Sequence, residues 1–165
     1  MTLNVLWLQS GGCGGCSMSL LCADTPDFAS MLRSSGIELL WHPSLSLESG
    51  AQVLDILDRI LDGSQTLDVL CLEGAVLRGP HDTGRFHVLA GTGVPMMDWV
   101  RRLSQVARHV VAVGSCAAWG GISATGSNPA QACGLQYEDE HPGGLLGKDF
   151  CSRGGLPVIN IAGCP

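Results

Sequence analysis

The chain has 165 residues, of which 45% are hydrophobic and 15% charged, and its formal net charge is -6 at pH 7. A chain of this length can bury a core of its own, so we expect one domain that folds without disulfide bonds. The acidic balance argues against a surface for nucleic acid or anionic membranes, because both require a basic stripe. We therefore expect small molecules or other proteins as partners, and no nucleic acid.

The N-terminus does not resemble a signal peptide, because the chain enters an apolar run at residues 4–8 almost at once. No apolar run is long enough to span a bilayer. We therefore expect a cytoplasmic protein with no membrane span. In a compartment that keeps thiols reduced, eight cysteines are better interpreted as metal ligands and buried side chains than as a disulfide framework.

Short strand-like runs alternate with helical patterns along the chain. We predict strands at residues 4–8, 37–41, 67–72, 109–113 and 157–161. We predict helices at residues 18–22, at 26–35 with Thr25 as the N-cap and Gly36 as the stop, at 53–61 before Gly63, and at 96–107. Residues 78–93 lack a period and are predicted to form a surface loop, and no element is assigned between 120 and 155.

Strands that alternate with helices imply right-handed crossovers and a parallel sheet covered on both faces. The sequence therefore predicts an α/β fold, namely a flavodoxin-like doubly wound parallel sheet with strand order 2-1-3-4-5. No repeat or linker divides the chain, so we expect residues 1–165 to form a single domain.

Cysteines follow three of the predicted strands. Cys13 and Cys16 follow the first strand, Cys116 the fourth and Cys164 the fifth, while Glu73 closes the third. Because the carboxyl ends of parallel strands meet at one edge of a sheet, we expect these side chains to lie together there. Neighbouring glycines permit close backbone approach to such a site and are predicted to surround it: Gly12, Gly14, Gly15, Gly114 and Gly163.

Four thiols at one edge can hold a zinc ion or an iron-sulfur cluster. Structural zinc usually stabilises a small domain that lacks a core, so we favour one 4Fe-4S cluster and keep a zinc-stabilised binding module as an alternative. The other four cysteines are assigned no ligand role. Cys22 and Cys71 are predicted to be buried side chains, and Cys133 and Cys151 lack the partners that a second metal site requires.

Four motifs resemble the small subunit of nickel-iron hydrogenases: SGGCGGCSMSL at 10–20, EG at 73–74, VGSCAAWGG at 113–121 and NIAGCP at 160–165. The resemblance implies that Cys13, Cys16, Cys116 and Cys164 hold the family's proximal 4Fe-4S cluster. It also implies an obligate heterodimer with a large subunit, which contains the nickel-iron centre, and a dimer of heterodimers is compatible with it. Hydrogen is then split in the partner and electrons pass through this chain to a downstream acceptor, so no catalytic residue and no nickel ligand are predicted here.

The residues of these motifs, together with WHPS at 41–44 and the stretch 143–146, resemble most the cytoplasmic hydrogen-sensing and uptake groups of that family. Oxygen-tolerant relatives have two further cysteines, where this chain has Gly15 and Gly121, so we expect an ordinary four-cysteine cubane. Many relatives have acidic residues where this chain has Gly12 and Ser17.

The family's second half, which binds the medial and distal clusters, is absent from these residues. We expect either a truncated chain or direct electron exit from the proximal cluster, and the position of Cys164 favours truncation. A cluster-bearing subunit of a respiratory-complex-like oxidoreductase is a further alternative, because it shares the Gly-Cys-Pro motif. Adjacent paired cysteines are expected there, and the Cys13-x-x-Cys16 spacing argues against it.

Overall fold

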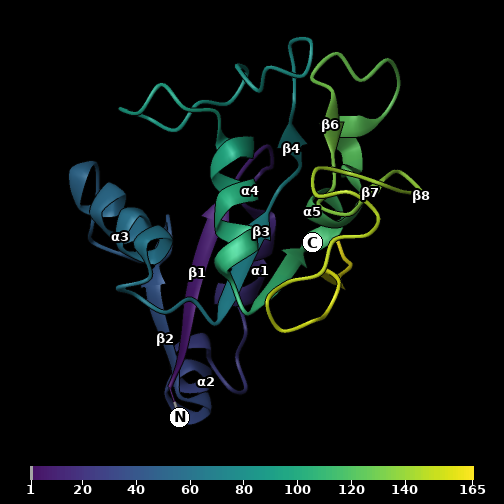
Figure 1. Cartoon of the computed structure of the whole chain (residues 1–165). Helices are drawn as coiled ribbons and strands as arrows, with labels where there is room; N and C mark the ends of the chain where they lie inside the picture. Colours follow the sequence, from purple (N-terminus) through teal and green to yellow (C-terminus); the bar gives the residue numbers. More distant parts are fainter. Residues whose placement is uncertain (1) are drawn as a thin grey trace.

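A computed structural model describes residues 2–165, and Figure 1 shows its helices and strands around one central sheet. The longer elements are β1 (Leu3–Gln9), α1 (Gly15–Leu21), α2 (Phe28–Ser35), β2 (Ile37–Trp41), α3 (Ala51–Asp62), β3 (Val69–Glu73), α4 (Met96–Val106), β5 (His109–Val113), α5 (Gly114–Trp119) and β9 (Ile159–Ile161). The shorter elements are β4 (Val76–Leu77), the 3-10 helix η1 (Gly121–Ala124), β6 (Ala132–Cys133), β7 (Tyr137–Glu138) and β8 (His141–Pro142).

Five strands form the central sheet in the order β2-β1-β3-β5-β9, and every neighbouring pair is parallel. Numbered by their sequence, these strands have the order 2-1-3-4-5, which confirms the predicted flavodoxin-like topology. All five therefore end at the same edge of the sheet, from which the loops into α1 and α5 depart. Two antiparallel ladders, β4-β6 and β7-β8, lie outside this sheet.

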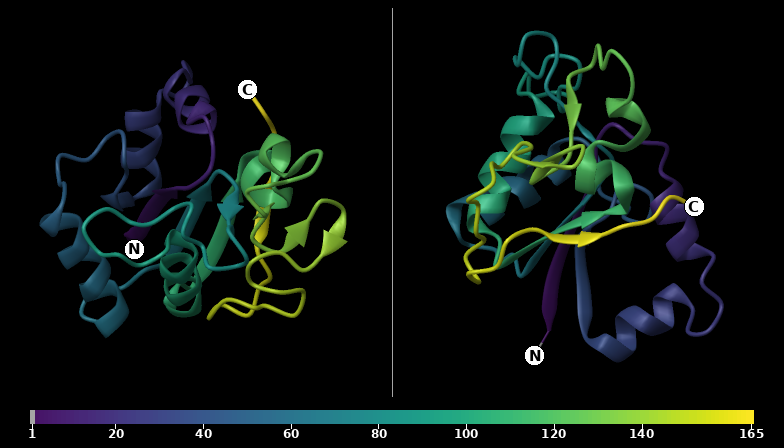
Figure 2. Two further views of the ribbon diagram at one scale, coloured as in Figure 1. Left: turned by 90° about the horizontal axis from the view of Figure 1, so that it is seen from above. Right: turned by 90° about the vertical axis from the view of Figure 1, so that its right-hand side faces the viewer.

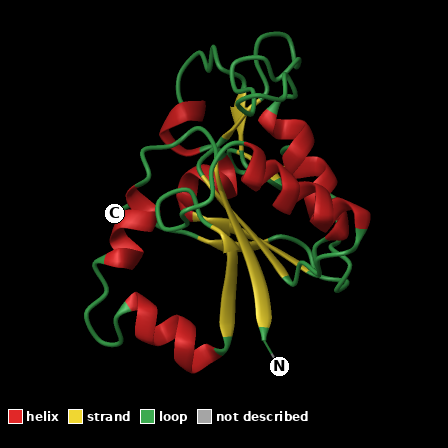
Figure 3. Cartoon of the chain, turned by 90° about the vertical axis from the view of Figure 1, so that its left-hand side faces the viewer, coloured by secondary structure: helices red, strands yellow, loops and turns green. Residues whose placement is uncertain are grey.

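Side chains alternate between the two faces of the sheet, as expected for β-strands. On one face, Leu6, Leu70 and Val110 join the main core with the apolar sides of α3 and α4. On the other face, Val5, Trp7, Cys71 and Val111 form a smaller cluster, against which Leu20 of α1 packs. Figures 2 and 3 show α3 and α4 on one side of the sheet and α1 and α2 on the other.

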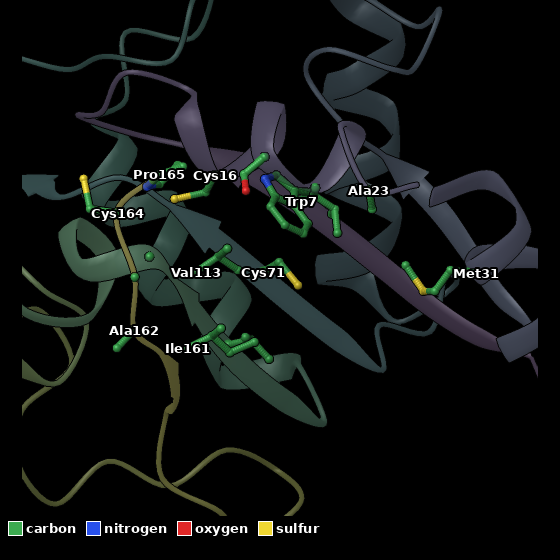
Figure 4. A pocket seen from close by; sticks show the side chains of 15 residues that line it. Trp7, Cys16, Ala23, Met31, Cys71, Val113, Ile161, Ala162, Cys164 and Pro165 are labelled. Atoms are coloured by element: carbon green, nitrogen blue, oxygen red, sulfur yellow. The ribbon is translucent and has the colours of Figure 1, made fainter. Parts of the chain in front are cut away.

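The face with α1 carries a largely apolar groove of about 730 Å³. Trp7, Cys71, Val111 and Ile161 line its floor, and Met31 contributes from α2. Figure 4 shows that Cys16 and Cys164 lie at the end of this groove that faces the carboxyl edge of the sheet. The groove therefore runs along this face of the sheet and ends at the region of the predicted metal site.

Several predicted boundaries differ from the structure. The helix α1 begins at Gly15 rather than Met18. The N-cap of α2 is Asp27 and not Thr25, because the Asp27 carboxylate directly precedes the helix and accepts the Ser30 N–H at 2.8 Å. Residues 78–93 form no helix or strand, apart from an isolated bridge between Val88 and Pro95, which confirms the predicted loop. Within the described residues, no helix has the length and apolar character needed to cross a membrane.

Candidate metal centre

The four predicted ligands all lie at the carboxyl edge of the sheet. Cys13 lies in the turn after β1, Cys16 in the first turn of α1, Cys116 in the first turn of α5, and Cys164 three residues after the end of β9. The Ser115 backbone N–H donates to the carbonyl oxygen of Gly163 at 2.8 Å, and this bond holds the start of α5 beside the segment with Cys164. The sheet topology thus brings three separate chain segments to one place.

Glycines surround the cysteine sulfurs closely. A Cβ atom on Gly114 would lie 2.3 Å from the Cys16 sulfur, and one on Gly121 would lie 2.6 Å from the Cys116 sulfur. Gly15 is in a similar position, since its Cβ would lie 3.1 Å from the Cys13 sulfur. A Cβ atom and a sulfur atom that are not bonded do not approach each other to 2.3 or 2.6 Å, so Gly114 and Gly121 cannot be replaced without moving the sulfurs. The backbone therefore forms a cradle around three of the four thiols, and at Gly114 and Gly121 only glycine can provide it.

The thiols also influence one another electrostatically. Burial raises the pKa of the Cys16 thiol, and Glu73, Cys116, Cys13 and Cys164 each raise it further, in that order. Such mutual effects require short separations, because charge interactions in proteins weaken with distance. A metal centre that binds these sulfurs must therefore displace their protons.

Two backbone N–H groups donate to sulfur in this region. The Gly15 N–H donates to the Cys13 sulfur at 3.4 Å. The pKa of Cys116 is raised by burial, while a hydrogen bond from the Ile122 N–H opposes that rise. Hydrogen bonds to ligand sulfurs are one of the means by which proteins tune iron-sulfur clusters. The donor set and its surroundings therefore fit a cluster that carries negative charge.

The spacing of these groups bears on the choice of metal. Among the described residues, no three His, Cys, Asp or Glu side chains are close enough together to hold one metal ion. Tetrahedral zinc requires its sulfurs at about 2.3 Å from a single ion. The four sulfurs are therefore not arranged around a single zinc ion in this structure.

Glu73 lies at the same edge, but its side chain points into the protein. It is 3% exposed and accepts hydrogen bonds from the backbone N–H of Ser17 at 3.1 Å, from Gln9 at 3.0 Å and from Trp7 at 3.1 Å. Ser17 also bonds to the ring of His42 at 3.2 Å. Spacing along the chain gave no signal for this network, because His42 and Glu73 lie 25 and 56 positions away from Ser17.

The remaining glycines predicted around the site differ in their roles. Gly163 contributes its carbonyl to the bond with Ser115, while a Cβ on Gly163 would meet nothing. Gly12 lies against Gly74, where a Cβ would be 3.0 Å from the Gly74 Cα. Gly12 therefore allows two backbone segments to approach each other rather than surrounding a sulfur.

The other cysteines lie outside this centre. Burial raises the pKa of Cys71 to about 12 and that of Cys133 to about 11, so both thiols behave as apolar core groups. Cys22 is exposed at the end of α1, so its prediction as a buried side chain was wrong. Cys151 is exposed whereas Cys133 is fully buried, and this contrast gives no support to a second site shared by the two.

Fold and geometry together define a flavodoxin-like domain in which four cysteines lie at the carboxyl edge of the sheet. Residues 13–165 match the family described as NADH ubiquinone oxidoreductase, 20 Kd subunit. The chain belongs to that family.

Individual relatives are nickel-iron hydrogenase subunits. The chain is 34% identical over 161 residues to the Hydrogenase-2 small chain of Escherichia coli K12, with coverage of 98% of this chain and 38% of that protein. It is 29% identical over 183 residues to the F420 non-reducing hydrogenase II small subunit of Methanosarcina mazei, with coverage of 98% and 44%. The chain thus spans about two fifths of the length of these curated relatives.

Solved structures agree with this relationship. The [NiFeSe] hydrogenase from Desulfovibrio vulgaris Hildenborough matches with a TM-score of 0.81 and 29% identity, over 100% of this chain and 55% of that chain. The actinobacterial-type NiFe-hydrogenase from Ralstonia eutropha H16 matches with a TM-score of 0.81 and 29% identity, over 99% and 49%. The predicted resemblance to nickel-iron hydrogenase small subunits is confirmed. Similarity to the cytoplasmic type in particular stays a prediction, since a periplasmic relative is also found.

Proposed function

We propose that this chain is the proximal-cluster domain of a nickel-iron hydrogenase small subunit. In this proposal Cys13, Cys16, Cys116 and Cys164 hold one 4Fe-4S cluster, which supplies one-electron transfer when bound. The chain's own residues orient the four sulfurs and donate backbone N–H groups to those of Cys13 and Cys116. Hydrogen is oxidised on the large subunit, and electrons leave through this chain.

The observation that carries the proposal is the glycine cradle around the sulfurs of Cys13, Cys16 and Cys116, which come from two chain segments. A core cysteine needs only an apolar pocket, and does not require a glycine at left-handed φ against its sulfur. Gly114 and Gly121 have φ values of 82° and 54° and stand against the sulfurs of Cys16 and Cys116. This combination favours a site shaped for a bulky inorganic group over ordinary packing.

A partner surface is proposed at the same edge. Ile122, beside the cradle, is 82% exposed, and Met18, two residues after Cys16, is 61% exposed. Large apolar side chains left in water next to a redox centre are typical of a surface that a partner covers. The relatives named small chain or small subunit imply a larger companion, so we propose a hydrogenase large subunit as the obligate partner.

The remaining features of the predicted function are also proposals. We propose a cytoplasmic enzyme of the hydrogen-sensing or uptake type, on the basis of the motifs at 41–44 and 143–146. We propose that electrons continue to a downstream acceptor, either directly or through clusters in a part of the protein that corresponds to the second half of its relatives.

The respiratory-complex alternative remains the second candidate, because the matched family bears the name of a subunit of that kind. The individual hydrogenase relatives, which match 98% of this chain, favour the first. The companion subunit distinguishes the two, since a hydrogenase large subunit is expected to contain paired Cys-x-x-Cys motifs near both ends.

Replacement of each proposed ligand by alanine tests the cluster assignment. The wild-type chain, produced with its partner under anaerobic conditions, should contain about four irons and four sulfides. Cys16→Ala or Cys116→Ala should lose most of this iron and the associated broad visible absorbance. Cys71→Ala is the control, because its thiol lies in the core, and it should retain the wild-type iron content. Equal loss of iron in both groups, or stoichiometric zinc in place of iron, would contradict the proposal.

A further inference from the structure

A closed network of buried polar groups lies directly behind α1. Glu73, Ser17 and His42 are 3%, 2% and 1% exposed, and none of them is a proposed ligand. Buried polar groups of this kind are costly unless every one is hydrogen-bonded. The contacts of these three residues therefore indicate what the network does.

The carboxylate of Glu73 is surrounded by donors. Its Oε2 accepts from Trp7 Nε1 at 3.1 Å, from Gln9 Nε2 at 3.0 Å and from the Ser17 hydroxyl, and its Oε1 accepts from the Ser17 backbone N–H at 3.1 Å. An ionised carboxylate offers about four acceptor positions. The structure supplies three donors to Oε2 and one to Oε1, so both carboxylate oxygens are hydrogen-bonded without a proton of their own.

The donor and the acceptor in each hydrogen bond of this network can be assigned, because a backbone N–H group can only donate. The Ser44 backbone N–H donates to Nδ1 of His42 at 3.1 Å, so the ring proton lies on Nε2, which donates to the Ser17 oxygen at 3.2 Å. Gln9 also donates to that oxygen, at 3.1 Å. The Ser17 hydroxyl hydrogen is therefore left for Glu73. All the bonds point toward the carboxylate, which is consistent with an ionised Glu73 beside a neutral His42.

The direction of the pKa shifts agrees with this geometry. Burial raises the pKa of Glu73, but the bonds from Ser17, Gln9 and Trp7 outweigh it and leave the pKa below its ordinary value. Burial lowers the pKa of His42, against an opposing effect of Glu73. The network thus holds one negative charge, and that charge lies on Glu73.

Glu73 also substitutes for a missing helix cap. The N-cap of α1 is Gly14, which has no side chain, so no side-chain bond from the N-cap reaches the first turn. A capping side chain normally accepts the N–H of the second or third helical residue. Ser17 is the third residue of α1, and Glu73 accepts its N–H from the end of β3. The residue before Ser17 is Cys16, so this bond fixes the backbone that carries a proposed ligand.

The same carboxylate acts on the thiols through space. Its Oε1 lies 3.1 Å from the backbone nitrogen of Ser17, the residue after Cys16, so its charge lies beside the helical turn that carries this sulfur. A fixed negative charge at this range opposes the addition of an electron to a group held by those sulfurs.

We propose that Glu73 is a positioning residue of the metal centre, which holds Cys16 in place through the Ser17 N–H and keeps the reduction potential of the centre low through its charge. This inference rests on the proposed function, because it assumes that a cluster binds Cys16. His42 and Trp7 support this role indirectly. His42 holds the hydroxyl group of Ser17, and Trp7 donates to Oε2 of Glu73.

Two substitutions at Glu73 separate the effect of its negative charge from the effect of its side-chain length. Glu73→Gln keeps the length of the side chain and an oxygen for the Ser17 N–H, but removes the charge. Glu73→Asp keeps the charge but is one methylene shorter, so it no longer spans the distance to that N–H. Glu38→Gln removes an exposed carboxylate on β2 and is the matched control. Each variant is produced with its partner, and iron content and the reduction potential of the cluster, followed by paramagnetic resonance, are measured.

We expect Glu73→Gln to shift the potential to more positive values, and Glu73→Asp to lose at least half of the bound iron, while Glu38→Gln matches the wild type in both. Loss of iron from Glu73→Gln, which keeps an acceptor for the Ser17 N–H, would contradict a positioning role exerted through that bond. A wild-type potential in Glu73→Gln together with wild-type iron in Glu73→Asp would overturn the inference. A wild-type protein without iron would show instead that the proposed function has failed.

Discussion

The conformation and surroundings of Gly114 decide where the Cys16 sulfur can lie. Gly114 has a φ of 82°, and a Cβ there would lie 2.3 Å from that sulfur and 3.5 Å from the carbonyl oxygen of Gly163. Two separate effects therefore exclude other residues at this position, namely backbone strain and direct collision. Gly126 isolates the first effect, because its φ is 69° and a Cβ there would meet nothing within 4 Å.

We predict that Gly114→Ala loses most of the cluster, whereas Gly126→Ala keeps it. Both substitutions place alanine in the left-handed region, at a cost of about 1–2 kcal/mol each. Only Gly114→Ala must also displace the Cys16 sulfur. Iron and sulfide per chain, compared with the free energy of unfolding of the metal-free proteins, distinguish the two effects. Equal iron in the two variants would show that the cradle has no role in loading.

Individual residues could be predicted from the sequence where their role depends on chain position. The four cysteines were placed at one edge because each follows a strand, and the structure puts all four there. The network of Glu73, Ser17 and His42 could not be predicted, since its members meet only after β1, β2 and β3 pair. Cys22 was predicted to be buried from its place in a helix, but a short helix with an exposed end does not bury every apolar position.

The helix α3 shows the relation between pattern and packing at the scale of an element. Val53, Ile56, Leu57 and Ile60 repeat with the helical period and are buried against the sheet and α4. Leu57 is 0% exposed, so its side chain is removed from water completely. The neighbouring Asp58 lies on the exposed side of the same turn, and the two residues report on opposite faces of one helix.

We predict that Leu57→Ala lowers the free energy of unfolding by about 2–5 kcal/mol, because the removed side chain leaves a cavity in the core. Asp58→Ala should change it by less than about 0.5 kcal/mol, as is usual for exposed positions without a partner. Chemical denaturation of the two variants checks this difference. A loss below 1 kcal/mol for Leu57→Ala would mean that α3 does not pack on the sheet as described.

Elements with a strong apolar repeat were predicted, whereas α5 and the two-residue strands were not. The helices α3 and α4 and the five sheet strands carry enough apolar repeats to be recognised along the chain. The six-residue helix α5 and the two-residue strands β4 and β6 carry no such signal. The strand β4 exists only because Val76 pairs with Cys133, and a pairing over that sequence distance is set by tertiary structure.

At the scale of the whole molecule, sheet topology creates the site. The order β2-β1-β3-β5-β9 places the ends of β1, β5 and β9 on one edge, with the end of β3 between β1 and β5. This order alone explains why the three cysteine-bearing segments and Glu73 lie close together. The distances between the side chains, however, depend on the glycine turns, so the sequence predicted which residues gather but not how they contact one another.

The last prediction concerns how many redox steps the whole chain supports. Further thiols next to the cluster would be needed to stabilise an additional oxidation step, and the two relevant positions are Gly15 and Gly121. A Cβ on Gly121 would lie 2.6 Å from the Cys116 sulfur, and one on Gly15 would lie 3.2 Å from Pro165 Cγ. Neither position holds a thiol, and Gly121 has no room for one.

We therefore expect a potentiometric titration followed by paramagnetic resonance to show one transition from this chain's cluster, with about four irons per chain. Two closely spaced transitions from one cluster, or about eight irons per chain, would contradict a single ordinary cubane held by four of the eight cysteines.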